Sequence, residues 1–178
     1  KFLKWARSAM LTAGSGQVHG QIIYDTLYAL DDNYEAQPQM AAGHEISEDG
    51  LTYTFHLRDA NWSDGKPVTA QDFLYAWTRV LDPAAGAKNP AMFFLIDGAE
   101  AAYNNGGEGD IAISAPDDKT FTFTLANRVP YMMQMLTYTN FFPVRQDIVE
   151  ADPEGWTRNA ATFVGNGPFR VTAFNFGE

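Results

Sequence analysis

Residues 51–58 alternate between apolar and polar side chains, and this run constrains the fold more than any other part of the chain. The apolar positions are Leu51, Tyr53, Phe55 and Leu57. Period-two alternation predicts a strand with one packed face and one face in water. A cluster of turn formers follows at Ser63-Asp64-Gly65-Lys66-Pro67, where Gly65 is free to take positive φ. We therefore expect a half-buried strand that leads into a tight turn.

A capped helix is predicted directly after this turn. Thr69 can cap it, and Asp72 stands three residues on, as a short-armed variant of the capping box. An apolar stripe at helical spacing follows, formed by Phe73, Trp77, Val80 and Leu81. Asp82-Pro83 ends the helix, because the residue before a proline is pushed out of the helical region. The spacing predicts a helix over 70–81.

Further strands and helices are indicated on both sides of this unit. The Asp49-Gly50 turn between alternating runs predicts a hairpin, in which a strand beginning at Glu45 pairs with 51–58. Apolar residues alternate with threonines over 120–125, which predicts a second half-buried strand. We also expect helices over 21–30, 93–103, 131–138 and 146–151, a helical turn over 37–42 and a last strand over 169–174. This mixture predicts an α/β fold of the mixed α+β kind.

Composition excludes several classes of partner. The chain has 178 residues, a net charge of −10 and only 12 Lys and Arg residues, which are spread thinly. A phosphate backbone needs clustered cations, so we expect neither nucleic acid nor an anionic membrane surface as a partner. With no cysteine there is no disulfide and no thiolate metal site. No apolar run is long enough for a transmembrane helix. There is no signal peptide or initiating Met, and the last predicted strand ends without a hairpin partner, so we expect part of a longer chain.

No arrangement of reactive side chains predicts catalysis or a metal site. Metal-ligand spacing is missing among the three histidines, His19, His44 and His56. The acidic pairs Glu48-Asp49 and Asp117-Asp118 stand in turn sequences, where adjacent acids form turns more often than acid–base pairs. Gly14-Ser15-Gly16 lacks the frame of a nucleophilic serine and is too short for a phosphate loop. A Met-rich stretch fits core packing or an adaptable binding face, and its members are Met132, Met133 and Met135.

Short motifs in one continuous order resemble those of a known family. They begin at Tyr28-Ala29-Leu30-Asp31, pass through Pro38 and Met40-Ala41, and run unbroken from Glu45 to Asp82-Pro83. The later motifs are Ala115-Pro116-Asp117-Asp118-Lys119-Thr120, Val129-Pro130-Tyr131, Phe142-Pro143-Val144 and Val164-Gly165-Asn166-Gly167-Pro168-Phe169. In these motifs the chain resembles the oligopeptide- and dipeptide-binding proteins of ABC importers, extracytoplasmic solute-binding proteins of family 5. The resemblance covers about residues 8 to 178.

The resemblance implies a periplasmic-binding-protein-like fold of type II, in which two α/β lobes close on a ligand. This chain would be an incomplete form of that fold, comprising lobe one alone. Residues 1–27 and 162–178 would belong to the ligand-facing sheet region of lobe one, and residues 28–161 would form an α/β subdomain inserted into it. The second lobe would be absent from this chain.

The same resemblance implies ligand contacts from two loops. The first matches Met10, Leu11, Thr12, Ala13 and Gly14. The second matches Lys88, Asn89, Pro90 and Ala91. The chain departs from the family pattern in both, because Ala13 replaces a common aspartate and Asn89-Pro90 replaces a common Ser/Pro-Tyr. Exposed backbone and small side chains suit an extended peptide that hydrogen-bonds alongside them.

The function that this resemblance implies is capture of extracellular peptides and their delivery to an ABC permease in the membrane, without catalysis or a cofactor. The protein would be a monomer in the periplasm or a cell-surface lipoprotein, with its anchor cysteine upstream of Lys1. The alternative is a related receptor for a nickel chelate, haem or a signalling peptide, acting as a sensor or adaptor, and His19 lies near the ligand loop. A peptide hydrolase is a third possibility, and it predicts turnover.

Overall fold

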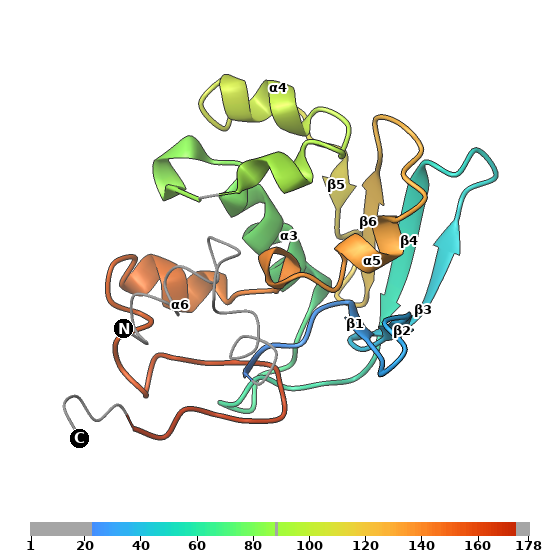
Figure 1. Cartoon of the computed structure of the whole chain (residues 1–178). Coiled ribbons are helices and arrows are strands. Elements are labelled where there is room, and N and C mark those ends of the chain that lie inside the picture. Colours follow the sequence, from blue (N-terminus) through green and yellow to red (C-terminus); the bar gives the residue numbers. More distant parts are fainter. Residues whose placement is uncertain (1–22, 88, 174–178) are drawn as a thin grey trace.

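The computed structural model describes residues 23–87 and 89–173, and a four-stranded antiparallel sheet is its largest sheet (Figure 1). Its strands are β3 (Ala41–Ile46), β4 (Thr52–Leu57), β5 (Ile113–Ser114) and β6 (Thr120–Thr124), in the spatial order β3-β4-β6-β5. Gly50 turns β3 into β4 at a φ of 72°, a conformation that costs glycine little because it has no Cβ. The predicted hairpin and the predicted strand over 120–125 are both confirmed.

Aromatic side chains form the packed face of this sheet. The pairing of β4 with β6 sets Tyr53 opposite Phe123 and Phe55 opposite Phe121. The rings of Tyr53 and Phe123 stack with their centroids 5.2 Å apart, and all four side chains are buried. Successive side chains of a strand point to opposite faces, so the threonines between them lie on the other face. The alternation in the sequence therefore assigned the two faces correctly.

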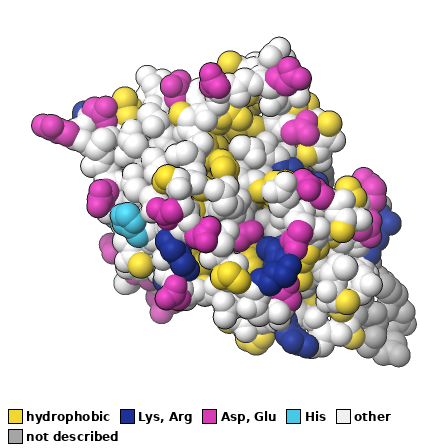
Figure 2. All heavy atoms as spheres, turned by 180° about the vertical axis from the view of Figure 1, so that it is seen from behind, with side chains coloured by type: hydrophobic (Ala, Val, Ile, Leu, Met, Phe, Trp, Pro, Cys, Tyr) yellow, Lys and Arg dark blue, Asp and Glu magenta, His cyan; other side chains and the backbone are white. Residues whose placement is uncertain are grey.

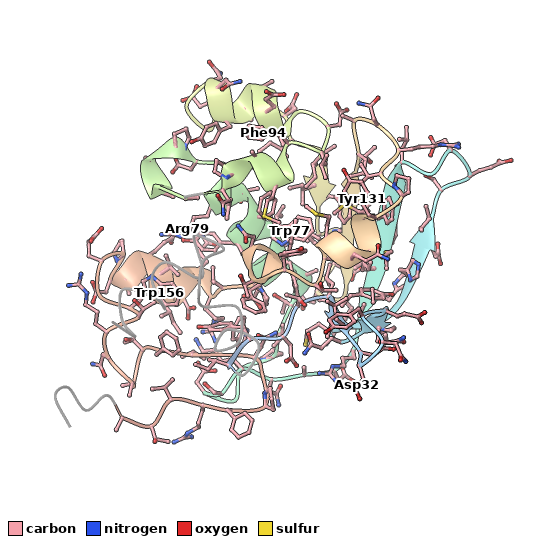
Figure 3. The ribbon with its side chains drawn as sticks, viewed as in Figure 1. Asp32, Trp77, Arg79, Phe94, Tyr131 and Trp156 are labelled. Carbon is pink, nitrogen blue, oxygen red and sulfur yellow. The ribbon has the colours of Figure 1, made fainter. Side chains whose placement is uncertain are left out.

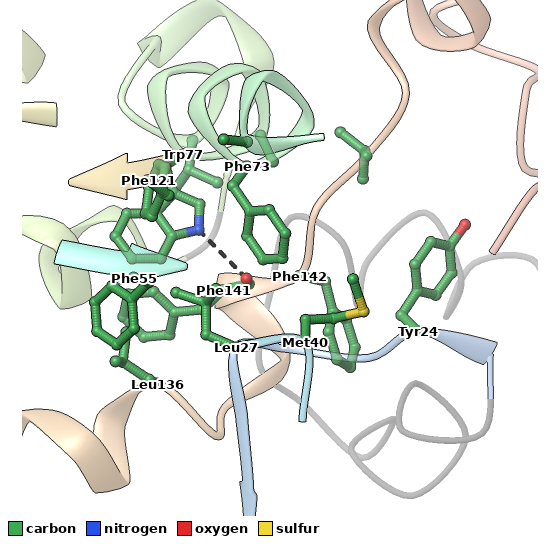
Figure 4. Packing of buried hydrophobic residues seen from close by; sticks show 14 of the residues in the cluster. Tyr24, Leu27, Met40, Phe55, Phe73, Trp77, Phe121, Leu136, Phe141 and Phe142 are labelled. Carbon is green, nitrogen blue, oxygen red and sulfur yellow. Dashed lines mark hydrogen bonds between the residues drawn. The ribbon is translucent and has the colours of Figure 1, made fainter. Parts of the chain in front are cut away.

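Helix α3 (Ala70–Val80) packs its apolar stripe on this face (Figure 4). The ring of Trp77 lies 4.8 Å from that of Phe121 and 5.0 Å from that of Phe141, and its indole Nε1–H donates to the Phe141 carbonyl at 3.3 Å. At the start of the helix, the Asp72 carboxylate accepts a hydrogen bond from the Thr69 backbone N–H at 2.9 Å. The predicted helix and the capping role of Asp72 are confirmed. We call β4, β6 and α3 together the sheet–helix unit.

Shorter helical segments complete this part of the chain. They are η1 (Pro83–Ala85), η2 (Pro90–Phe93), α4 (Ala99–Asn104), α5 (Met132–Met135), η3 (Thr139–Phe141) and α6 (Gln146–Ala151). Figure 1 shows α3, α4 and α6 to the left of the sheet. Helix α6 agrees with its prediction, whereas α4 and α5 are shorter than predicted. Within residues 23–87 and 89–173, none of the helices has the length and apolar character needed to span a bilayer.

The segment before β3 contradicts its prediction. Residues 28–30 and 36–38 form the hairpin strands β1 (Tyr28–Leu30) and β2 (Ala36–Pro38), not a helix and a helical turn. Within the described part of the predicted helix over 21–30, only Ile23 is helical. The carbonyls of Thr26 and Leu27 instead accept hydrogen bonds from the backbone of residues 39–41. The apolar spacing fits a helix, but long-range backbone pairing decides the structure.

Residues 23–24, at the start of the described chain, lie beside residues 164–167, which are near its end. The Gly167 N–H donates to the Ile23 carbonyl at 2.8 Å, and the Tyr24 hydroxyl donates to the Val164 carbonyl at 2.7 Å. Residues 169–173 are not in a strand, contrary to the predicted strand over 169–174, whose last residue lies outside the described part. The architecture is a mixed α/β fragment, as predicted, whose entry and exit segments are joined.

Candidate ligand-binding site

Of the two predicted ligand loops, the structure describes one. Met10, Leu11, Thr12, Ala13 and Gly14 lie outside the described residues, as do Lys88 and His19. Asn89, Pro90 and Ala91 lie at the start of η2, where Asn89 precedes the helix and Pro90 takes its first position. Proline suits that position, because its fixed φ matches the helix and its missing N–H has no partner there. Asn89 and Pro90 are half-buried and Ala91 is exposed.

An aromatic anchor holds this loop on the core. Phe93 closes η2 and is fully buried. Its ring centroid lies 5.5 Å from that of Trp77 and 4.6 Å from that of Phe141. Because residues 90–93 form a single short helical segment, the anchor fixes the backbone of 89–91 relative to α3. The backbone of residues 89–91 is therefore held in place by packing of Phe93 in the core.

A cavity of about 470 Å³ lies between α3, η1 and α6. Part of its lining, in η1, precedes the loop 89–91 in the chain. Its walls combine aromatic, cationic and acidic side chains. They are Tyr75, Thr78, Arg79, Asp82, Ala84, Ala85, Val149, Glu150, Pro153, Glu154 and Trp156. Figure 3 places Arg79 and Trp156 beside α6. The volume falls in the range of small-molecule sites, which runs from roughly 300 to 1,000 Å³.

Two polar side chains of this cavity, Tyr75 and Arg79, stand one helical turn apart on α3. Burial raises the pKa of the Tyr75 phenol, the positive charge of Arg79 opposes that shift, and the negative charge of Glu150 adds to it. Tyr75 therefore stays a neutral donor and acceptor at neutral pH. Arg79 lies in the last turn of α3, where a cation interacts favourably with the helix dipole. This wall can hydrogen-bond a polar group but holds no activated nucleophile.

Sequence reasoning missed this cavity. Its walls come from two stretches, 75–85 and 149–156, which no local pattern links. Tyr75 and Arg79 did carry a signal, because they stand at i and i+4 on the face of α3 away from the apolar stripe. That signal identifies two neighbours on a helix but does not say what they face.

The acidic clusters are structural, as predicted. The Asp49 carboxylate accepts hydrogen bonds from Ser47 and from the Leu51 N–H, and the Asp117 carboxylate accepts them from the backbone of Lys119 and Thr120. In both cases these hydrogen bonds hold the pKa below its ordinary value, which is opposite to the shift that a general acid needs. These acids form turns.

A second charged group joins two distant loops. The Arg145 guanidinium donates two hydrogen bonds to Asp147, at 2.8 and 2.6 Å, and its Nη1 donates to both carboxylate oxygens of Asp64, at 3.1 and 3.4 Å. Lys66 Nζ lies 2.9 Å from the same Asp147. Hydrogen bonding from Arg145 is the main reason that the pKa of Asp147 is far below its usual range. Every charge in this group has a partner of opposite sign, which indicates a structural role.

The remaining candidates also occupy structural positions. His44 Nδ1 is hydrogen-bonded to the Tyr28 hydroxyl at 2.7 Å, and His56 lies 3.7 Å from Glu45. The described residues hold no group of three or more side chains suited to a metal ion. Met132 is buried, and the half-buried Met133 and Met135 pack against the core, in agreement with the core-packing interpretation. The face in Figure 2 shows scattered acidic groups and no continuous basic strip.

Comparison with known proteins places this geometry in context. The family model described as "Bacterial extracellular solute-binding proteins, family 5 Middle" matches residues 35–178. The chain is 40% identical over 153 residues to the dipeptide-binding protein DppE of Bacillus subtilis, covering 84% of this chain and 28% of DppE. It is 41% identical over 165 residues to the oligopeptide-binding protein OppA of the same species, covering 88% of this chain and 30% of OppA.

A solved structure extends the likeness to the backbone. The crystal structure of Haemophilus influenzae OppA in complex with the peptide RPPGFSPFR matches with a TM-score of 0.84 at 32% identity, over 94% of this chain and 33% of that one. The chain thus spans between 28% and 33% of the length of these three proteins.

Proposed function

This chain belongs to family 5 of the bacterial extracellular solute-binding proteins, and we propose that it is the first-lobe part of a receptor that captures peptides outside the cytoplasm. The resemblance read from the motifs is confirmed by the family match. In the proposal, the receptor binds an oligopeptide or dipeptide between two lobes and delivers it to an ABC permease. It performs no chemistry on the peptide.

One observation carries this proposal: the backbone of nearly the whole chain matches a protein crystallised with a peptide. Residues 28–161 then form the inserted subdomain, and 1–27 with 162–178 belong to the sheet region of lobe one. The supported backbone of Asn89, Pro90 and Ala91 contributes one side of the peptide site, and Met10 to Gly14 contribute the other. Exposed backbone with small side chains binds peptides of varied sequence, because main-chain hydrogen bonds do not depend on side-chain identity.

Native mass spectrometry of the full-length parent protein, purified without denaturation, tests the proposal. We expect a ladder of co-purifying masses that fragment as peptides, and the ladder would also give the length range. A single non-peptide mass would contradict the proposal and favour the nickel, haem or sensor alternatives. So would an empty protein that added peptides do not stabilise against heat.

Residues 1–178 alone test the division between lobes. Because the proposed ligand is held by both lobes, we expect this chain by itself to bind peptide weakly or not at all. Titration calorimetry with the peptide RPPGFSPFR measures this directly. Micromolar affinity for the isolated chain would show that one lobe suffices.

A further inference from the structure

The segment Val164 to Gly167 makes a set of contacts that the proposed ligand site does not use. Asn166 is buried, at 5% exposure. Its side-chain Oδ1 accepts the Asp25 backbone N–H at 3.0 Å, and its Nδ2 donates to the Asp25 carbonyl at 3.0 Å. One amide thus pairs with both polar groups of one residue, as a neighbouring strand would. The two residues are 141 positions apart in the chain.

Backbone contacts on either side extend this pairing. The Gly167 N–H donates to the Ile23 carbonyl at 2.8 Å, and the Ser63 N–H donates to the Gly165 carbonyl at 2.8 Å. The Tyr24 hydroxyl adds a bond to the Val164 carbonyl. Three segments that are far apart in the sequence are thereby joined at one place. We call residues 23–25 and 163–167 the clasp.

The two glycines let the segments of the clasp approach this closely. A Cβ placed on Gly165 would lie 2.2 Å from the Ile23 carbonyl oxygen, and one on Gly167 would lie 2.7 Å from the Ile23 carbonyl carbon. Both neighbours are backbone atoms, which cannot turn aside as a flexible side chain can. Glycine is therefore required here for the close approach of two backbones.

Asp25 is held through its side chain as well. Its carboxylate accepts a hydrogen bond from Gln39 at 2.8 Å and lies 3.1 Å from an Arg58 nitrogen. Burial raises the pKa of this carboxyl, and the charge of Arg58 opposes the shift. Arg58 follows β4 directly, so the clasp is linked to the sheet–helix unit through charged and amide contacts.

The place of the clasp in the chain points to its role. Residues 28–161 leave it and return to it, and within that excursion lies the loop 89–91. Gly14, the last residue of the other predicted ligand loop, is only nine positions before Ile23. Along the chain, the clasp therefore joins the segment that follows one predicted loop to the subdomain that carries the other. We propose that Asn166 is a positioning residue, which fixes the inserted subdomain relative to the N-terminal segment so that both loops meet one peptide.

This inference rests on the proposed function, and its test separates the two. In the full-length protein, freed of co-purified ligand, Asn166→Ala removes both bonds to Asp25. Val80→Ala is the matched control, because Val80 is equally buried but lies on α3, outside the clasp. Calorimetry with RPPGFSPFR and with trialanine measures affinity well below the melting temperature. We expect Asn166→Ala to weaken binding about tenfold, in the usual range of coupling between sites, and Val80→Ala to leave it unchanged.

A second readout needs no ligand. This chain has no cysteine, so Ala91→Cys with Thr172→Cys introduces two defined sites for spin labels at exposed positions, one in the inserted subdomain and one after the clasp in the chain. We expect a narrow distance distribution in the otherwise unaltered protein and a broad one with Asn166→Ala. If Asn166→Ala does not fold, Asn166→Asp replaces it, since it keeps the acceptor for the Asp25 N–H but loses the donor.

The outcomes are distinct. Equal affinity in Asn166→Ala and the unaltered protein, or an equal loss in Val80→Ala, overturns the positioning role. If the unaltered protein binds neither peptide and also co-purifies with none, the proposed function fails. The label distances then test only whether Asn166 fixes the inserted subdomain. An unchanged distance distribution in Asn166→Ala refutes that role, and a broadened one supports it.

Discussion

The sheet–helix unit and the clasp are held together by different parts of the polypeptide. In the unit, large side chains such as Trp77 and Phe121 fill the space between α3 and the sheet. In the clasp, backbone groups and one amide meet where a Cβ would already collide. Where side chains fill a core, the fold loses stability as buried volume is removed. Where two backbones are in direct contact, an added side-chain atom has no space to occupy. The first region should respond to lost atoms and the second to added ones.

The largest effect is expected in the unit, from Trp77→Ala. Trp77 is fully buried and its ring contacts four others, those of Phe93, Phe121, Phe123 and Phe141. Losing this volume should cost about 3–5 kcal/mol of unfolding free energy, measured by urea denaturation. Tyr131→Ala is the control, because Tyr131 is 56% exposed, and it should cost less than about 1 kcal/mol. Similar costs for the two would contradict a core centred on Trp77.

The clasp is tested by adding a methyl group. Gly165→Ala sets a Cβ against the Ile23 carbonyl oxygen, and such overpacking costs typically about 1–3 kcal/mol. Gly43→Ala adds the same methyl group in β3, where no atom beyond the adjacent residues of the chain lies within 4 Å of the new Cβ, and should change stability by less than about 0.5 kcal/mol. Thermal unfolding of both variants measures the contrast. An equally mild Gly165→Ala would mean that the two backbones can separate without loss.

The same contrast explains what could be read from the sequence. Strands β4 and β6 and helices α3 and α6 follow from local alternation, spacing and caps, and the structure contains them where predicted. The prediction of a helix over 21–30 was wrong. The same apolar spacing is compatible with a non-helical segment, and the carbonyls of this segment pair with residues 39–41. Asn166 appeared in the sequence only within a family motif, and its pairing could not be predicted, since its partner is 141 positions away.

The candidate site divides in the same way. The turn roles of Asp49 and Asp117 are local and were predicted correctly. The cavity near Tyr75 depends on how α3 packs near α6, and no local sequence pattern predicts that packing. Residues 89–91 could be placed on a loop through the family motifs, but their support by the buried Phe93 became visible only in three dimensions.

A smaller effect tests the local signals of the unit. The Asp72 carboxylate accepts hydrogen bonds from the Thr69 N–H and from the Trp62 indole at 3.1 Å. Asp72→Ala removes the cap and leaves the buried Trp62 donor without its acceptor, so we expect a loss of about 1–2 kcal/mol. The exposed neighbour Gln71, changed to Ala, is the control and should change stability by less than about 0.5 kcal/mol. Both are measured by urea denaturation.

The smallest effect concerns the charged group that joins residues 64–66 to the start of α6. Hydrogen bonds from Arg145 and then Lys66 lower the pKa of Asp147 in the folded chain, while the unfolded value is about 3.9. An acid whose folded pKa is depressed stabilises the fold above the unfolded pKa, and this contribution is lost as pH falls towards the folded value. Asp147 is 52% exposed, so solvent screening limits the contribution to about 0.5 kcal/mol.

Asp147→Asn should therefore reduce stability at pH 7 by about this amount and have progressively less effect as the pH falls below 4. Urea denaturation at pH 7, 4 and 2.5 measures the trend, and repeating the pH 7 series in 1 M salt should shrink the difference because exposed charges are screened. A cost that stays constant from pH 7 to 2.5 would assign the effect to lost packing or lost neutral hydrogen bonds. In that case the contact between residues 64–66 and α6 would resemble the clasp, held by geometry, and charge would contribute little to it.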